Sequence, residues 1–433
     1  MHRLIIPAFL PLLVCCAILP TDVAHGAGLQ VVQTPYYVMH TDLPPDAVKE
    51  ASLRMTRMAE EYHERTKAFS GKVNQRLPFY LFQEEEDYYA AGGVPGSAGV
   101  YMRRGNERKL MAIAGKEVSD TTWHVIQHEG FHQFADATIG ELPAWVNEGL
   151  AEYFGEAVWT GDGFVVGIVP AGRLKRIQEG IEAKSFRPLP LMMRLTLQEW
   201  NMNLNIDNYD QAWAMCHFLA HADEGKYQEA FVAFVRGVNR RVPWQNAWQQ
   251  AFGSVEGFEK VWGDWWLKQQ PGATADLETR ATLCTLASFA ARANAMKQLP
   301  TELPGLIKAI ESGEMKFEKE LWLPPSLFER ASANLKRDDA TYSMLPAEKG
   351  QPPKLLAVRP DGTRMIVSFP IRFSLPVKQT VEVDDLAPAI VRVEALVKDG
   401  KKKEAQKLLS DAMRRNPKST SIERARQLAG QLR

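Results

Sequence analysis

The stretch that decides the fold runs from Thr121 to Gly155, TTWHVIQHEGFHQFADATIGELPAWVNEGLAEYFG. It contains the pattern His-Glu-x-x-His at residues 128–132. Residues four apart in an α-helix lie one turn above each other on the same face, so His128 and His132 would point in one direction. Two imidazoles placed in this way can bind one metal ion, and Glu129 can reach a water on that ion. We therefore expect a metal centre at this helix.

The residues that follow predict a second helix that returns to the first. Gly140 is suited to ending a helix, and Pro143 is suited to a first helical position. A reversal of the chain at Gly140 would bring Glu148 back to the two histidines as a third ligand. Two histidines, one glutamate and one water make the open four-coordinate site expected of catalytic Zn²⁺. Glu152, one turn beyond Glu148, could accept the free ring N–H of a ligand histidine and orient it.

The two motifs together resemble those of the gluzincin metallopeptidases, the thermolysin and aminopeptidase N group of the peptidase MA-like superfamily. The resemblance rests on His-Glu-x-x-His followed by Trp-x-Asn-Glu-Gly-x-Ala-Glu-Tyr, and it extends from Ser97 to Leu219. It implies that His128, His132 and Glu148 bind Zn²⁺. It also implies that Glu129 is the general base, which takes a proton from the attacking water and passes it to the leaving amine.

The sequence departs from the family pattern in one respect. The gap between His132 and Glu148 is a few residues shorter than in thermolysin. Glu152 would suit a thermolysin-like gap better, but the Asn-Glu-Gly context favours Glu148. His124 lies one turn before the motif on the same face; spacing alone assigns it no role, and we leave it out of the ligand set.

Two other interpretations of these residues stay open. The histidines and Glu129 could lie on a solvated helix face and bind nothing. Alternatively, the chain could be a catalytically silent binding or scaffold protein of the cell envelope that keeps a zinc-protease fold. For the enzyme, the sequence does not distinguish an endopeptidase from an aminopeptidase, although no acidic motif for a substrate amino group is evident, which favours the endopeptidase.

A tyrosine is the candidate for stabilising the oxyanion that forms during hydrolysis. Tyr209, preceded by Asn208 as the expected helix cap, begins a helix that resembles the gluzincin helix supplying such a residue. Tyr153 and Tyr101 remain alternatives, and His217 is a weaker alternative proton donor.

A hairpin is predicted between Ala98 and Ala114, before the metal-binding helix. In gluzincins an edge strand at this place pairs with an extended substrate, so the resemblance implies that one arm of the hairpin binds a peptide or protein substrate. The glycines that precede this hairpin are equally consistent with a plain flexible turn.

Composition and the N-terminal sequence limit the class of partner and the location of the protein. The 433 residues include 52 basic and 52 acidic side chains, which gives no indication of a nucleic-acid partner. Residues 1–27 predict a secretory signal, so the mature chain would be exported to the periplasm or outside the cell without a stable membrane span. Lipid attachment at Cys15 or Cys16 is less favoured, because the preceding residues are not small. Cys216 and Cys284 would remain in the mature chain, either paired or buried.

The predicted fold class is α+β. Residues 28–270 would form the catalytic domain, with a small mixed β-sheet in 28–140 and a mainly helical half in 141–270. The aromatic residues of 224–270 occur at helical spacing and predict a helix–helix core. Residues 271–433 would form an accessory region that ends in a tetratricopeptide-like helical hairpin at 386–433, a possible docking site for a protein partner.

Overall fold

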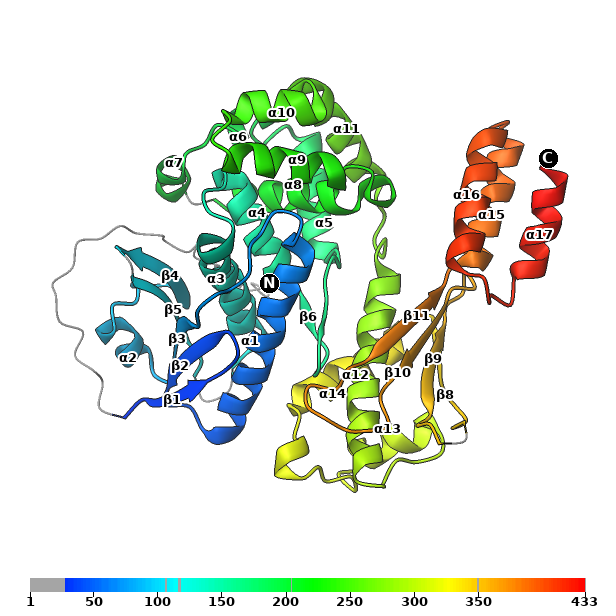
Figure 1. Cartoon of the computed structure of the whole chain (residues 1–433), viewed down its shortest axis with the longest axis horizontal. Helices are drawn as coiled ribbons and strands as arrows, with labels where there is room; N and C mark the ends of the chain where they lie inside the picture. Colours follow the sequence, from blue (N-terminus) through cyan, green and yellow to red (C-terminus); the bar gives the residue numbers. More distant parts are fainter. Residues whose placement is uncertain (1–27, 106, 116–117, 204, 349, 433) are drawn as a thin grey trace, which may run out of the picture. The chain divides into compact units, whose positions relative to one another are not determined.

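The computed structural model describes residues 28–105, 107–115, 118–203, 205–348 and 350–432 (Figure 1). The chain divides into two compact units. Unit 1 comprises Met1–Val158 and Phe164–Thr274, and unit 2 comprises Trp159–Gly163 and Ala275–Arg433. Both units combine helices with β-sheet, which confirms the predicted α+β class. The predicted signal segment lies outside the described residues.

A five-stranded mixed sheet forms one half of unit 1. Its order is β1-β2-β3-β5-β4. β2, β3 and β5 are mutually parallel, whereas β1 and β4 run antiparallel to their neighbours. The strands are β1 (Gln30–Gln33), β2 (Tyr37–Thr41), β3 (Leu77–Phe82), β4 (Gly99–Arg104) and β5 (Glu107–Ile113). β1 and β2 are joined by a turn between Thr34 and Tyr37.

Helices cover both faces of this sheet. On one face, Phe79, Leu81 and Leu110 pack under α1 (Pro45–Thr66) and α3 (Asp120–Thr138). On the other, alternate strand residues pack against Tyr88 of α2 (Glu85–Ala90). Because side chains alternate along a strand, each strand contributes to both layers. The sheet thus supports α3, the helix of the His-Glu-x-x-His motif.

The second half of unit 1 is helical. Its helices are α4 (Ala144–Gly155), α5 (Ala171–Glu182), α6 (Leu189–Met192), α7 (Leu197–Met202), α8 (Ile206–Gly225), α9 (Gln228–Asn239), α10 (Trp244–Phe252) and α11 (Val255–Lys268). The aromatic residues of 224–270 form a continuous core here with α4 and α8, as predicted. α4 packs against both α3 and α8. The chain between α4 and α5 also forms a short hairpin of β6 (Val158–Trp159) and β7 (Phe164–Val165), of which Trp159–Gly163 belongs to unit 2.

Unit 2 contains a four-stranded antiparallel sheet of order β11-β10-β9-β8. β9 (Lys354–Val358) and β10 (Arg364–Ser368) form the central hairpin, and β8 (Thr341–Leu345) and β11 (Thr380–Asp384) lie at the two edges. The helices are α12 (Ala275–Ala295), α13 (Leu303–Glu311), α14 (Pro325–Arg337), α15 (Leu386–Lys398), α16 (Lys402–Arg415) and α17 (Ile422–Gln431), and residues Lys319–Leu321 form a single 3₁₀ turn, η1.

Buried polar contacts hold unit 2 together. Arg292 of α12 makes two hydrogen bonds to the carboxylate of Asp162, at 2.7 and 3.1 Å, and both side chains are buried. The three last helices share an apolar core that includes Ile390, Leu409 and Ala425. Cys216 of unit 1 and Cys284 of unit 2 are free and buried. None of the helices that the structure describes is long and apolar enough to cross a membrane.

Candidate metal centre

Local sequence explains where the two helices of the site begin and end. The side chain of Ser119 accepts a hydrogen bond from the Thr122 N–H and so caps α3. Gly140 has a φ of +100°, a conformation that glycine adopts without steric cost, and the chain reverses there. α4 then begins immediately after Pro143. The motif residues are thereby carried on two adjacent helices joined by a short turn.

Gln127, next to His128, fixes the position of α4 against α3. Its side-chain amide donates to the carbonyl oxygens of Phe154, Gly155 and Ala157, each at 3.1 Å, at the C-terminal end of α4. The Phe154 carbonyl also accepts from the Ala157 N–H at 3.1 Å, and the amide adds a side-chain partner at this end of α4, where carbonyls lack intrahelical partners. Arg54 of α1 donates in turn to the Gln127 side-chain oxygen at 2.9 Å. Gln127 thus links α1, α3 and α4 at the position next to His128.

The predicted ligand atoms converge. The Nε2 atoms of His128 and His132 lie 3.1 Å apart. The Oε2 atom of Glu148 lies 3.5 Å from the first and 3.6 Å from the second. All three side chains are buried. Three buried donor atoms 3.1–3.6 Å apart are close enough to share one ion. The overlapping group of His128, Glu129 and His132 could also hold a metal ion.

Glu129 lies beside this cluster under the edge of the sheet. Its Oε1 atom is 4.0 Å from His128 Nε2, and its Oε2 atom accepts a hydrogen bond of 2.6 Å from the backbone N–H of Tyr101 on β4. Burial raises the pKa of Glu129, although the two histidines and the Tyr101 N–H act in the opposite direction. A carboxylate with a raised pKa is better matched to accepting a proton near neutral pH.

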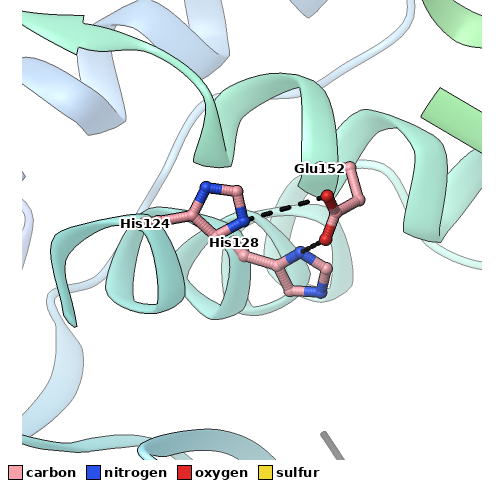
Figure 2. A group of neighbouring side chains, drawn as sticks. All are labelled: His124, His128 and Glu152. Carbon is pink, nitrogen blue, oxygen red and sulfur yellow. Dashed lines mark ion pairs between the residues drawn. The ribbon is translucent and has the colours of Figure 1, made fainter. Parts of the chain in front are cut away.

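The carboxylate of Glu152 contacts two imidazoles of α3, those of His124 and His128 (Figure 2). Its Oε1 atom lies 3.1 Å from Nδ1 of His128, and its Oε2 atom lies 3.8 Å from Nε2 of His124. A proton on His128 Nδ1 leaves the lone pair on Nε2, toward Glu148. His124 therefore contacts the carboxylate that orients a candidate ligand, a place that its spacing alone did not reveal.

His124, His128 and Glu152 are also close enough together to hold an ion. Arg173 of α5, however, pairs with the same Oε2 atom of Glu152 at 2.5 Å. The charge of this carboxylate is thus already balanced by a guanidinium. A second cation there would meet the repulsion of Arg173. We therefore interpret this group as one that orients His128.

Arg173 connects the site to α8. Its Nε atom lies 2.9 Å from Asp210 Oδ1, its Nη1 atom lies 3.2 Å from Glu156, and its guanidinium stacks over Trp213. Arg176, one turn further along α5, makes two hydrogen bonds to the same Asp210. Buried charges are stable only when paired, and this network pairs each of them.

The pKa values of the ligand candidates indicate a negative potential at the centre of the cluster. Burial lowers the pKa of His128, but its contacts with Glu148 and Glu152 outweigh burial and raise that pKa to about 10. Burial raises the pKa of Glu148, but His132 and His128 outweigh it and lower the pKa to about 2. The carboxylates therefore stabilise a positive charge next to the two imidazoles, and a bound cation would experience the same potential.

The three candidate tyrosines have different neighbours in the structure. The ring of Tyr209 lies 6.3 Å from the ring of His128, whereas the Tyr153 hydroxyl pairs with His221 and the Tyr101 hydroxyl donates to Asp136. Tyr209 is in the first turn of α8, but the predicted cap is wrong. Asn205 caps the helix instead; Asn208 lies inside it. His217 is bound to the carbonyl oxygen of Gly167.

Residues 123–245 match the model of a family described as a protein of unknown function (DUF1570). The matched segment includes most of α3 and all of α4, α5 and α8, and therefore His128, Glu129, His132, Glu148 and Glu152. No curated protein and no solved structure matches the chain.

Proposed function

We propose that the protein is an exported zinc-dependent metallopeptidase of gluzincin type. The observation that supports this best is the convergence of two imidazole nitrogens and one carboxylate oxygen in a buried site that also holds Glu129. Export is inferred from the N-terminal sequence, and peptide hydrolysis from the site together with the motif resemblance.

The spacing of the donor atoms favours zinc. Zinc–nitrogen and zinc–oxygen bonds of about 2.0–2.1 Å at tetrahedral angles place neighbouring donor atoms about 3.3 Å apart. The three observed separations are 3.1, 3.5 and 3.6 Å. Two neutral histidines and one carboxylate are a donor set that suits zinc and leaves a fourth position for water or substrate. The residues therefore fit the ion that the motif implies.

The roles of the side chains follow from their positions. When bound, zinc supplies Lewis-acid chemistry, which acidifies a water and polarises a carbonyl. Glu129 would take the proton of the attacking water and deliver it to the leaving amine. Glu152 holds His128 in the ligating tautomer, and Arg173 keeps Glu152 ionised. Tyr209 would donate a hydrogen bond from its hydroxyl to the developing oxyanion.

The edge of the sheet offers a place for an extended substrate. In the described part of the sheet β4 is an edge strand, paired with β5 alone. The Ala98 carbonyl accepts from Ile113 of β5, so by alternation the backbone groups of Gly99, Tyr101 and Arg103 point outward. Glu129 binds the outward N–H of Tyr101. A peptide added along this edge would lie beside the proposed base.

The test compares wild type with Glu129→Gln. Both proteins are loaded with zinc, the metal content is measured by atomic emission, and cleavage of a mixed peptide library is read by mass spectrometry. Glu129 is not among the three converging donors, so the variant should keep zinc and lose cleavage. Glu141→Gln is the matched control, because the same substitution at an exposed residue should change neither property.

Each outcome decides between the alternatives. Zinc in both proteins and cleavage by wild type alone supports the peptidase. Zinc in both and cleavage by neither favours the scaffold protein. Absence of zinc from wild type contradicts the proposal at its first step.

A further inference from the structure

Two arginines lie opposite each other at the end of the β4–β5 hairpin. Arg103 and Arg108 are paired in the antiparallel register and therefore project from the same face, which is also the face of Tyr101. Both guanidiniums bind the single carboxylate of Asp136 on α3. The Arg103 Nη1 atom lies 2.7 Å from Oδ1, and Arg108 Nε contacts Oδ2. The Tyr101 hydroxyl also donates to Oδ2, at 2.8 Å.

This cluster has a surplus of positive charge. Like charges directly opposite each other on neighbouring strands repel, and Asp136 offsets only one of the two. The adjacent Lys109 and Glu107 pair with each other at 2.7 Å, so they add no net charge. The side chain of Arg103 is 57% exposed, compared with 23% for Arg108. The uncompensated charge therefore faces solvent mainly at Arg103.

The surplus lies beside the path proposed for the substrate. Asp136 is one helical turn beyond His132 on the motif face of α3. Arg103 is two residues along β4 from Tyr101, whose N–H marks the level of Glu129, and two strand residues span about 6.6 Å. A peptide at the edge of β4 would thus pass Arg103 about two residues away from the one beside Glu129.

We propose that Arg103, held in place by Asp136 together with Arg108, is a subsite for a carboxylate of the substrate, two residues from the bond that is cleaved. This inference rests on the proposed peptidase function. A guanidinium matches the geometry of a carboxylate, and a guanidinium already held by Asp136 loses little conformational freedom on binding. The carboxylate is either an Asp or Glu side chain or the C-terminus of the peptide.

The experiment measures kcat/KM of the zinc-loaded protein on matched peptides. One series places Glu, Gln or Lys two residues to either side of the cleaved bond. A second series ends two residues after that bond, with a free or an amidated C-terminus. Wild type should prefer the carboxylate-bearing member of one series about fivefold, as expected for a partly exposed ion pair. The series that shows the preference identifies the source of the carboxylate.

Two variants test the residue itself. Arg103→Ala should abolish the preference for the carboxylate, because it removes the exposed guanidinium and leaves Arg108 and Asp136 as a balanced pair. Arg104→Ala is the matched control: this neighbouring arginine is equally on β4 and exposed, but it projects from the opposite face, so the preference should persist.

The results separate this inference from the proposed function. Cleavage without a carboxylate preference, or equal loss in both arginine variants, overturns the subsite while the peptidase stands. Binding of the same peptides to zinc-loaded Glu129→Gln, followed by fluorescence anisotropy, gives a readout that needs no catalysis. A carboxylate preference in binding that Arg103→Ala removes supports the subsite. If no peptide is cleaved or bound, both proposals are wrong.

Discussion

Replacing Gly149 by alanine should weaken both folding and metal binding, because this glycine lies where α4 touches α8. A Cβ atom built there would be 2.4 Å from the carbonyl oxygen of Ala212 and 2.7 Å from Sγ of Cys216. Ordinary carbon–oxygen contacts are about 3.3 Å or longer, so the overlap is about 0.9 Å. The oxygen belongs to the backbone of α8 and cannot rotate away. The two helices must therefore separate or tilt by about 1 Å.

The expected stability change combines two opposing effects. Overpacking of a core costs about 1–3 kcal/mol, and the higher helix propensity of alanine returns up to about 1 kcal/mol. The free energy of unfolding should therefore fall by about 1–2 kcal/mol. Glu148 precedes Gly149 on α4, so the same movement displaces its carboxylate from the two histidines. Because metal ligands tolerate only a few tenths of an ångström of displacement, zinc affinity should fall at least about tenfold.

Urea unfolding of the zinc-free protein measures the stability change, and competition with a chromogenic chelator measures the affinity. Gly263→Ala in α11 is the control. Its Cβ would meet only Ile181 Cγ2, at an ordinary 3.7 Å, so this variant should be unchanged or slightly more stable and should keep zinc. A Gly149→Ala protein with wild-type stability would refute the packing argument. Normal zinc affinity in a destabilised variant would refute the link from this contact to Glu148.

Three further perturbations are expected to have distinct effects. Arg173→Met leaves buried Glu152 without its counter-ion and should weaken zinc binding about 10–100-fold in chelator competition, more than Arg176→Met, since Arg176 does not contact Glu152. Tyr209→Phe should lower kcat about 100-fold or more without changing zinc content; an unaltered kcat would exclude it as the oxyanion donor. Burial, and next the neighbouring His221, lower the pKa of His217 from 6.5 to about 3. At a pH between these two values the unfolded chain carries a proton on His217, whereas the folded chain does not. This difference contributes up to roughly 5 kcal/mol to the free energy of unfolding. The contribution is complete above pH 6.5 and is lost as the pH falls toward 3. In urea unfolding of the zinc-free proteins, the free energy of unfolding should therefore fall more between pH 7 and pH 4 in wild type than in His217→Phe.

The helical periodicity of residues 121–155 was sufficient to predict which ligand candidates share a face. A residue's direction from a helix depends only on its position in the same helix, so His128, Glu129 and His132 could be grouped without knowledge of the rest of the chain. The turn at Gly140 was equally local. It allowed Glu148 to be placed opposite the histidines, and the structure brings these atoms together. The aromatic core of 224–270 followed from the same kind of pattern.

Local patterns failed where a strand or a partner depends on a distant segment. The edge strands β8 and β11 are half-exposed or exposed, and their sequences lack the continuous apolar runs of the central strands β9 and β10. The cap of α8 was misplaced because Asn205 and Asn208 are chemically equivalent candidates. In the folded chain the Asn205 side chain accepts from the Asp207 N–H and caps the helix. The Asn208 side chain accepts from Arg187 instead.

The contacts that hold the candidate site in place could be identified only from the folded chain. Arg173 comes from α5, the amide of Gln127 acts on the end of α4, and the N–H that holds Glu129 belongs to Tyr101 of the sheet. A backbone N–H is common to nearly all residues, so no sequence pattern marks the one that will bind the carboxylate of the proposed base. Likewise, Arg173 of α5 reaches Glu152 of α4 at the candidate metal centre only through the packing of these helices in the folded chain. The periodicity along a single helix was enough to group the candidate ligands on one face. Their orientation, ion pairs and burial depend on packing between the helices and the sheet.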